Sequence, residues 1–172
     1  MSRTLSILAL SLATSLIPQS LSAKEMPSSD GISFEHPILQ EARVTAIFGM
    51  RKDPFTQRPG WHGGTDLGAA WDADIYAPAT GEVAFAGKRA GYGTMVDLKV
   101  SDGWILRFAH MKSAGVETGE TVESGDVLGQ VGSIGRSTGP HLHFEARFDD
   151  KQYDPADLQH LRFYAIEKQR GG

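Results

Sequence analysis

The chain has 172 residues, with 17 Lys and Arg against 21 Asp and Glu, so its formal net charge is −4. This length suits one domain, and 40% hydrophobic with 22% charged residues excludes a disordered or fibrous chain. An acidic chain with scattered Lys and Arg lacks the clustered basic residues that bind nucleic acid. Cysteine is absent, so any metal site must use histidines and carboxylates.

Residues 1–23 have the pattern of a secretory signal peptide. Arg3 precedes an apolar run from Leu5 to Leu16, and small residues follow as far as Ala23. The apolar run is shorter than the ~20 residues that cross a bilayer, so we expect no membrane span. The pattern predicts cleavage after Ala23 and an exported protein, in the periplasm or secreted. Outside the cytoplasm, chemistry that depends on ATP or NAD is disfavoured.

The next segment, residues 24–43, is polar with Pro27 and Pro37, and we expect a lead-in that wraps the domain. From Val44 onward, short apolar stretches are separated by glycine-containing turns every 8–12 residues, which is typical of an all-β sandwich or barrel. The clearest predicted strands are 83–86, 94–100, 104–109 and 127–131.

A short peripheral helix is predicted near the C-terminus. Asp154 can cap its N-terminus, and Pro155 suits the first helical position. Residues 159–172 are then a C-terminal tail, and the domain itself is predicted over residues 44–158.

Four of the six histidines lie in well-defined contexts. His62 and Asp66 frame a His-Gly-Gly-Thr-Asp segment, and in an extended chain residues four apart point to the same face. His141 and His143 are two apart, which in a strand places both imidazoles on one face and the intervening leucine on the other. His110 follows an apolar stretch and is expected at the C-terminal end of a strand.

These residues predict a catalytic zinc site. Such sites use three His or carboxylate ligands and leave one position for water. His62, Asp66 and one of the pair His141 and His143 would complete a set of two histidines and one carboxylate. The other member of the pair and His110 would then lie beside the bound water, where a histidine serves as general base.

The motifs resemble those of the lysostaphin-type (LytM-type) zinc metallopeptidases, over residues 44–158 and in unbroken order. The matching segments are Phe48-Gly49 with Arg51, His62-Gly63-Gly64-Thr65-Asp66, Ala77-Pro78-Ala79, Gly91-Tyr92-Gly93, Phe108-Ala109-His110-Met111 and Ser137-Thr138-Gly139-Pro140-His141-Leu142-His143-Phe144-Glu145.

The resemblance implies a two-sheet β fold of the duplicated hybrid motif type, and hydrolysis of peptide crosslinks in peptidoglycan. It implies that His62, Asp66 and His143 bind Zn²⁺. It also implies that His110 and His141 position and deprotonate the water. All five positions are present in this chain.

Five further residues carry open interpretations. Phe108 stands where the family usually has tyrosine, so a substrate-side hydroxyl is expected to be missing. Arg51 and Arg136 either bind carboxylates of the wall peptide or are solvated surface cations. Trp61 either forms part of the cleft or packs in the core. Glu145 either supports a ligand histidine or faces outward from its strand.

Two alternatives to the peptidase stay open. One is a non-catalytic regulator or wall-binding module on the same fold, as in family members that lose ligands. The other is a phosphocarrier of the sugar-transport type, which the signal peptide disfavours because phosphoryl donors are cytoplasmic. The sequence specifies neither the bond that is cut nor any protein regulator.

Overall fold

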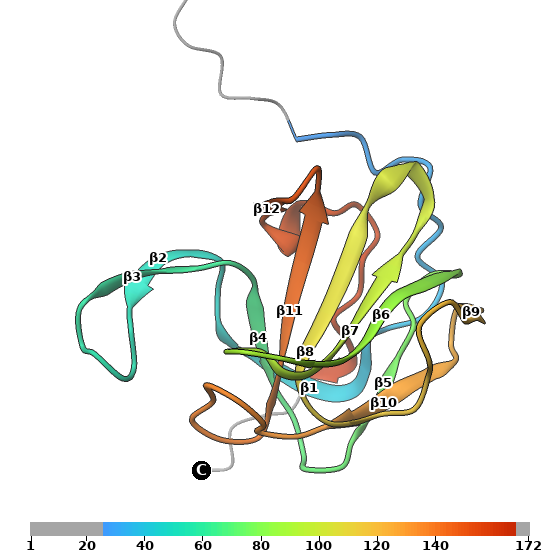
Figure 1. The fold of residues 1–172 in the computed structure, drawn as a ribbon. Helices are drawn as coiled ribbons and strands as arrows, with labels where there is room; N and C mark the ends of the chain where they lie inside the picture. Colours follow the sequence, from blue (N-terminus) through green and yellow to red (C-terminus); the bar gives the residue numbers. More distant parts are fainter. Residues whose placement is uncertain (1–25, 168–172) are drawn as a thin grey trace, which may run out of the picture.

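A computed structural model describes residues 26–167, and nearly all of its regular structure is β-strand (Figure 1). Two 3-10 helices accompany the strands, η1 (Ser101–Gly103) and η2 (Pro155–Asp157). The strands are β1 (Leu39–Ala46), β2 (Gly49–Lys52), β3 (Pro59–His62), β4 (Thr65–Gly68), β5 (Asp74–Tyr76), β6 (Gly81–Arg89), β7 (Gly93–Lys99), β8 (Ile105–Ala114), β9 (Thr121–Val122), β10 (Val127–Val131), β11 (His141–Phe148), β12 (Lys151–Tyr153) and β13 (Tyr164–Glu167). The prediction of an all-β fold is confirmed.

Eleven strands form one mixed sheet. Its main path runs β13-β1-β4-β11-β8-β7-β6-β9, and β8 also pairs with β10, so the sheet branches there. β1 and β13 are parallel, whereas the other pairs in this sheet are antiparallel. The predicted strands at 83–86, 94–100, 104–109 and 127–131 correspond to β6, β7, β8 and β10.

The sheet extends beyond residues 44–158 at both ends. β1 begins at Leu39, and its first residues pair with β13, which lies in the predicted tail. The division into lead-in, peptidase domain and tail stays a prediction. The predicted signal peptide, residues 1–23, lies outside the described residues.

A second, two-stranded sheet consists of β2 and β3 and projects to one side of the main sheet (Figure 1). Asp53 shapes its loop by accepting hydrogen bonds from the backbone amides of Phe55 and Thr56 at 2.9 and 2.8 Å. The hairpin therefore stands beside the main sheet and forms one side of the cleft described below.

The predicted short helix is present as a single 3-10 turn, η2. The Asp154 carboxylate accepts a hydrogen bond from the Ala156 amide at 3.0 Å, and Pro155 occupies the first turn. Within residues 26–167, no helix has the length and apolar character that crossing a membrane requires.

The core is aromatic at its centre. Trp104, Phe108 and Phe144 are fully buried, and the rings of Phe108 and Phe144 lie 5.2 Å apart. The expectation that position 108 faces the substrate is therefore wrong, because its side chain points into the core. A tyrosine hydroxyl here would be a buried polar group that needs its own partner.

Candidate metal centre

A cleft of about 920 Å³ lies between the β2–β3 hairpin, the open face of β1, β4 and β11, and the loop before β11. All five predicted site residues line this cleft: His62, Asp66, His110, His141 and His143. The structure thus gathers in one place residues that are spread over eighty positions of sequence.

Strand pairing places the β4 and β11 side chains. His143 pairs with Asp66, and Leu142 pairs with Leu67. Both leucines are fully buried in the core, so the neighbouring polar side chains face the cleft. The predicted alternation of this His-Leu-His segment is therefore confirmed.

His62 and Asp66 meet by a route that the sequence pattern did not predict. His62 ends β3 in the small sheet, whereas Asp66 lies in β4 of the main sheet, so the two do not share one extended strand. The chain bends between them at Gly63 and Gly64. A methyl group on Gly64 would overlap the carbonyl oxygen of Phe144, so glycine permits the close approach to β11.

His110 does not end its strand as expected, because β8 continues to Ala114. It instead has a φ of +60°, an uncommon backbone conformation for a residue other than glycine, and the pairing between β7 and β8 shifts around it. Its amide bonds the Tyr92 carbonyl at 2.9 Å. This irregularity turns the imidazole toward the cleft, as is common at functional sites.

Three histidines are oriented by backbone carbonyls. Their Nδ1 atoms lie at hydrogen-bonding distance from carbonyl oxygens: His62 from Ile47 at 2.8 Å, His110 from Ile134 at 2.9 Å and His141 from Gly139 at 2.8 Å. A carbonyl oxygen can only accept, so Nδ1 carries the proton in each ring. In the neutral imidazole, Nε2 is then an acceptor.

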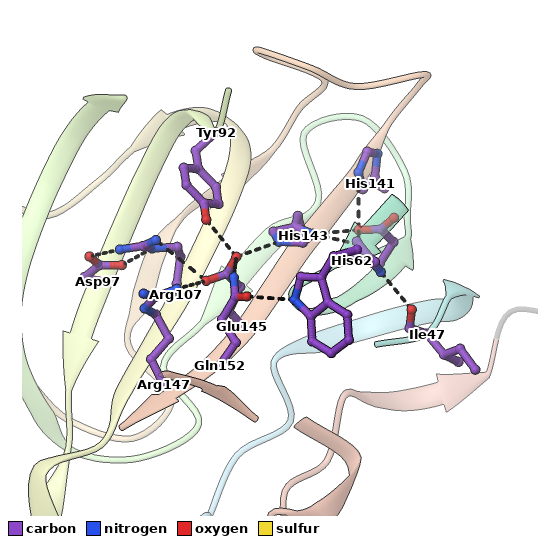
Figure 2. A network of polar contacts seen from close by, with 12 residues as sticks. Ile47, His62, Tyr92, Asp97, Arg107, His141, His143, Glu145, Arg147 and Gln152 are labelled. Carbon is purple, nitrogen blue, oxygen red and sulfur yellow. Dashed lines mark hydrogen bonds and ion pairs between the residues drawn. The ribbon is translucent and has the colours of Figure 1, made fainter. Parts of the chain in front are cut away.

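His143 is oriented the opposite way, by a carboxylate. Its Nε2 donates to Oε1 of Glu145 at 3.1 Å, which leaves Nδ1 facing the cleft, 2.8 Å from Oδ1 of Asp66 (Figure 2). A carboxylate behind a ligand histidine fixes its tautomer and raises its basicity. Glu145 is 1% exposed, so the interpretation as an outward-facing strand residue is wrong.

The chemistry of the inner atoms fits a divalent metal ion. His62 Nε2, Asp66 Oδ1 and His143 Nδ1 all lie within 4.8 Å of one another, and the two nitrogens are 3.1 Å apart. With the outer nitrogens protonated, all three are acceptors facing one point, which is unfavourable without a cation among them. Two imidazoles and a carboxylate are a ligand set that zinc uses in catalytic sites.

The second oxygen of Asp66 is held separately. Arg51 donates from Nη2 to Oδ2 at 3.2 Å, which leaves Oδ1 to the histidines. Burial alone would raise the pKa of Asp66. When their inner nitrogens are protonated, His143 and His62 donate to Oδ1, and these hydrogen bonds and charges hold the pKa well below its usual range. Asp66 is therefore a carboxylate at neutral pH.

Glu145 is the centre of a buried polar network (Figure 2). Its Oε1 accepts from Tyr92 at 2.9 Å and Gln152 at 3.0 Å, and its Oε2 accepts from Arg147 at 2.7 Å. Despite burial, hydrogen bonds from His143 and Arg147 lower the pKa of Glu145 to about 2. The network thus holds an ionised carboxylate against the back of His143.

His110 and His141 lie next to the three clustered residues. His141 Nε2 is 3.7 Å from Oδ1 of Asp66, and the rings of His110 and His141 are 5.0 Å apart. Burial lowers the pKa of His110, so its imidazole is neutral at neutral pH. Each can therefore accept a proton or hydrogen bond from a molecule in the cleft.

Trp61 is 58% exposed and lines the cleft, so it forms part of the cleft and does not pack in the core. Its indole Nε1 donates to Oε1 of Gln152 at 3.0 Å. Arg136 bonds Asp53 at 2.7 Å and stacks over Phe55 at 4.3 Å, which joins the hairpin loop to the loop before β11.

Sequence reasoning missed Tyr92, Gln152 and the pair Arg107–Asp97. Arg107 makes two 2.8 Å hydrogen bonds to Asp97 and lies 3.6 Å from Glu145. The only signal was the match of Gly91-Tyr92-Gly93 to the family. Their partners come from other strands, so spacing along the chain could not pair them.

Residues 60–155 match the peptidase family M23, which is more than half of the chain. The chain belongs to peptidase family M23. The predicted resemblance to lysostaphin-type metallopeptidases is therefore confirmed, and so is the metallopeptidase class.

Individual M23 relatives agree with this. The chain is 36% identical over 116 residues to the DD-carboxypeptidase/endopeptidase Mpg of Neisseria meningitidis, covering 67% of this chain and 27% of that protein. It is 36% identical over 104 residues to the peptidoglycan DD-endopeptidase ShyC of Vibrio cholerae, covering 60% and 24%. The chain thus spans about a quarter of the length of these curated relatives.

A solved structure shares the fold. The catalytic domain of lysostaphin from Staphylococcus simulans superposes with a TM-score of 0.62 at 27% identity, covering 67% of this chain and 90% of that domain. This M23 chain therefore corresponds to nearly all of a peptidase catalytic domain, although it spans only a fraction of its longer curated relatives.

Proposed function

We propose that this chain is an exported, zinc-dependent endopeptidase that hydrolyses peptide crosslinks of peptidoglycan. One observation carries the proposal. Four histidines have their outer nitrogens bonded to fixed acceptors, so that their inner nitrogens and one oxygen of Asp66 converge in a single cleft. A structural cluster would not point three acceptor atoms at one another, because this is unfavourable unless a cation lies among them.

We assign the ligand role to His62, Asp66 and His143, whose inner atoms lie together. A zinc ion held there supplies a Lewis acid, which polarises a peptide carbonyl and makes water acidic near neutral pH. Arg51 positions Asp66 by donating to its Oδ2, and Glu145 positions His143 by accepting from its Nε2. Both bonded atoms face away from the centre of the cleft.

We assign the proton transfers to His110 and His141. Hydrolysis requires a base to take one proton from the attacking water and an acid to return one proton to the leaving amine. Nε2 of His141 and Nε2 of His110 are free to hold that proton, because the Nδ1 atoms already donate to carbonyls. Protonated imidazole beside the reaction centre also stabilises the negative charge on the carbonyl oxygen.

The relatives and the signal-peptide pattern support the proposed substrate and location. Mpg and ShyC are named as endopeptidases, the latter of peptidoglycan, and residues 1–23 have a signal-peptide pattern. A fusion carrying residues 1–30 should reach the periplasm and lose about 23 residues. Recovery of the intact leader in the cytoplasm would contradict export.

The test of the function is mass spectrometry of muropeptides from purified sacculi incubated with the protein. We expect crosslinked dimers to decline and monomers to rise with zinc-loaded protein. The reaction should stop with a chelator and resume when zinc is added. Dimers that persist in the presence of zinc-loaded, folded protein would overturn the proposal.

The alternative is a non-catalytic regulator or wall-binding module on the same fold. It predicts a protein that binds sacculi without changing their muropeptides. Measuring the zinc content distinguishes the phosphocarrier alternative from the other two. A phosphocarrier requires no metal and would carry a phosphorylated histidine.

A further inference from the structure

Three arginines line the cleft, and two of them already have anionic partners. Arg51 pairs with Asp66 at 3.2 Å, and Arg136 pairs with Asp53 at 2.7 Å. Of the three cleft-lining arginines, which all lie in the described part of the chain, only Arg43 has a guanidinium with no hydrogen bond, ion pair or ring contact. An unpaired cation therefore faces the cleft.

Strand register fixes where Arg43 lies. On β1 it pairs with Gly68 of β4, and Gly68 pairs in turn with His141 of β11, so the three form one row across adjacent strands. Residues directly opposite in a sheet share a face, and so do residues two apart along a strand. Arg43 thus faces the same side as Asp66 and His143, one row away.

Gly68 lets the side chains of Thr45 and Arg43 on β1 lie over β4. A methyl group at Gly68 would lie 3.7 Å from Nε of Arg43 and only 2.7 Å from the Cγ2 atom of Thr45. The Arg43 side chain therefore lies over Gly68, the residue that separates it from His141 in the row. The row that contains Arg43 lies about 7 Å along the strands from the row that contains Asp66 and His143. Two residues of an extended peptide span this distance.

We propose that Arg43 is a specificity-determining residue that binds a carboxylate of the peptide substrate, one or two residues from the bond that is cut. This rests on the proposed function of the cleft. A guanidinium matches a carboxylate with two parallel hydrogen bonds, which a backbone carbonyl cannot offer. Arg43 is exposed and no acidic side chain of the cleft pairs with it, so its guanidinium is available to an anionic group of the ligand.

The experiment compares soluble crosslinked muropeptide dimers that carry free carboxylates with the same dimers after amidation. For Arg43→Gln we expect kcat/KM on free dimers to fall about 10- to 100-fold, mainly through KM, the scale of a lost charge-assisted hydrogen bond. For amidated dimers, kcat/KM of Arg43→Gln should differ from that of wild type by less than about 3-fold. Arg43→Lys should restore part of the difference, because it keeps the charge but not the planar fork.

The matched control is Arg89→Gln. Arg89 is an exposed arginine on β6 that stacks on Phe85 at 4.5 Å and does not line the cleft. This variant should behave as wild type on both dimers. All variants should keep the zinc content and thermal stability of wild type, which separates a substrate contact from a structural role.

A binding measurement tests the role of Arg43 independently of peptidase activity. Free and amidated dimers are titrated into zinc-loaded His110→Ala protein, with and without Arg43→Gln. Loss of the carboxylate preference with Arg43→Gln supports the proposal, even if wild type cleaves neither dimer and the peptidase function fails. A preference that survives Arg43→Gln, or no preference with Arg43 present, overturns it.

Discussion

Glu145 and His143 lie two residues apart on β11 and are joined by a 3.1 Å hydrogen bond from Nε2 to Oε1. This bond determines which nitrogen of His143 faces the cleft. His143 presents Nδ1, whereas His62 presents Nε2 to the same carboxylate oxygen. The planes of the two imidazoles are tilted by 56° to each other, and each presents a different nitrogen to Asp66.

The first prediction concerns this bond. Glu145→Ala should weaken zinc binding about 10- to 100-fold, the usual effect of removing such a support. It also removes the carboxylate that Arg147 bonds, whereas Arg107 keeps its two hydrogen bonds to Asp97, so stability should fall by about 1–3 kcal/mol. Glu145→Gln, which retains an acceptor oxygen, should bind zinc with intermediate affinity. Competition with a chromophoric chelator measures the affinity, and Glu82→Ala, at an exposed position of β6, should match wild type.

The second prediction separates ligand from base. His143→Ala should lose both zinc and activity, because two ligands rarely retain the ion. His110→Ala and His141→Ala should keep zinc but lose activity about 10²- to 10⁴-fold, the scale of general acid–base catalysis. Dialysed proteins are assayed for metal and for crosslink cleavage together. If His141→Ala emptied the site while His143→Ala retained zinc, the roles would be reversed.

The third prediction tests the close approach between β4 and β11. Gly64→Ala forces a methyl group onto the Phe144 carbonyl, a backbone atom that cannot move aside easily. We expect a loss of about 3 kcal/mol from overpacking, which lowers Tm by roughly 6–12 °C for a chain of this size. Gly139→Ala is the matched control, because nothing lies within 4 Å of its added methyl group. Equal thermal melts for the two variants would contradict the packing.

The fourth prediction concerns the pKa of Asp53 and the stability of the protein at low pH. The Thr56 amide and then Arg136 hold the pKa of Asp53 well below its usual range. A depressed pKa contributes stability above the unfolded value near pH 4, and this contribution is lost as pH falls through the lower folded value. In Arg136→Ala the pKa should rise but stay depressed, because the amides remain. An NMR titration of the Asp53 carboxyl measures this. Lys112→Ala, whose cation pairs with Asp72, should leave the titration unchanged.

Local patterns predicted the strands and the alternation of His141, Leu142 and His143, because period-two geometry acts within one strand. The choice of His143 over His141 as ligand came from the family resemblance, and it stays a prediction. Its geometric basis lies in Glu145, whose side chain fixes the outer nitrogen of one histidine and not of the other.

Other features depend on tertiary contacts that the sequence does not encode locally. The position of His110 depends on a strand irregularity supported by the Tyr92 carbonyl. His62 and Asp66 meet because two sheets converge at Gly63 and Gly64, and not because one strand carries both. Such contacts link residues far apart in sequence, so periodicity could not reveal them.

The most direct test of the account is an anomalous difference map at the zinc absorption edge from crystals of the zinc-loaded protein. We predict one strong peak at about 2.0–2.2 Å from Nε2 of His62, Oδ1 of Asp66 and Nδ1 of His143. His110 and His141 should lie beyond bonding distance of that peak. A peak bonded to His141 in place of His143, or no peak in this cleft, would contradict the assignment.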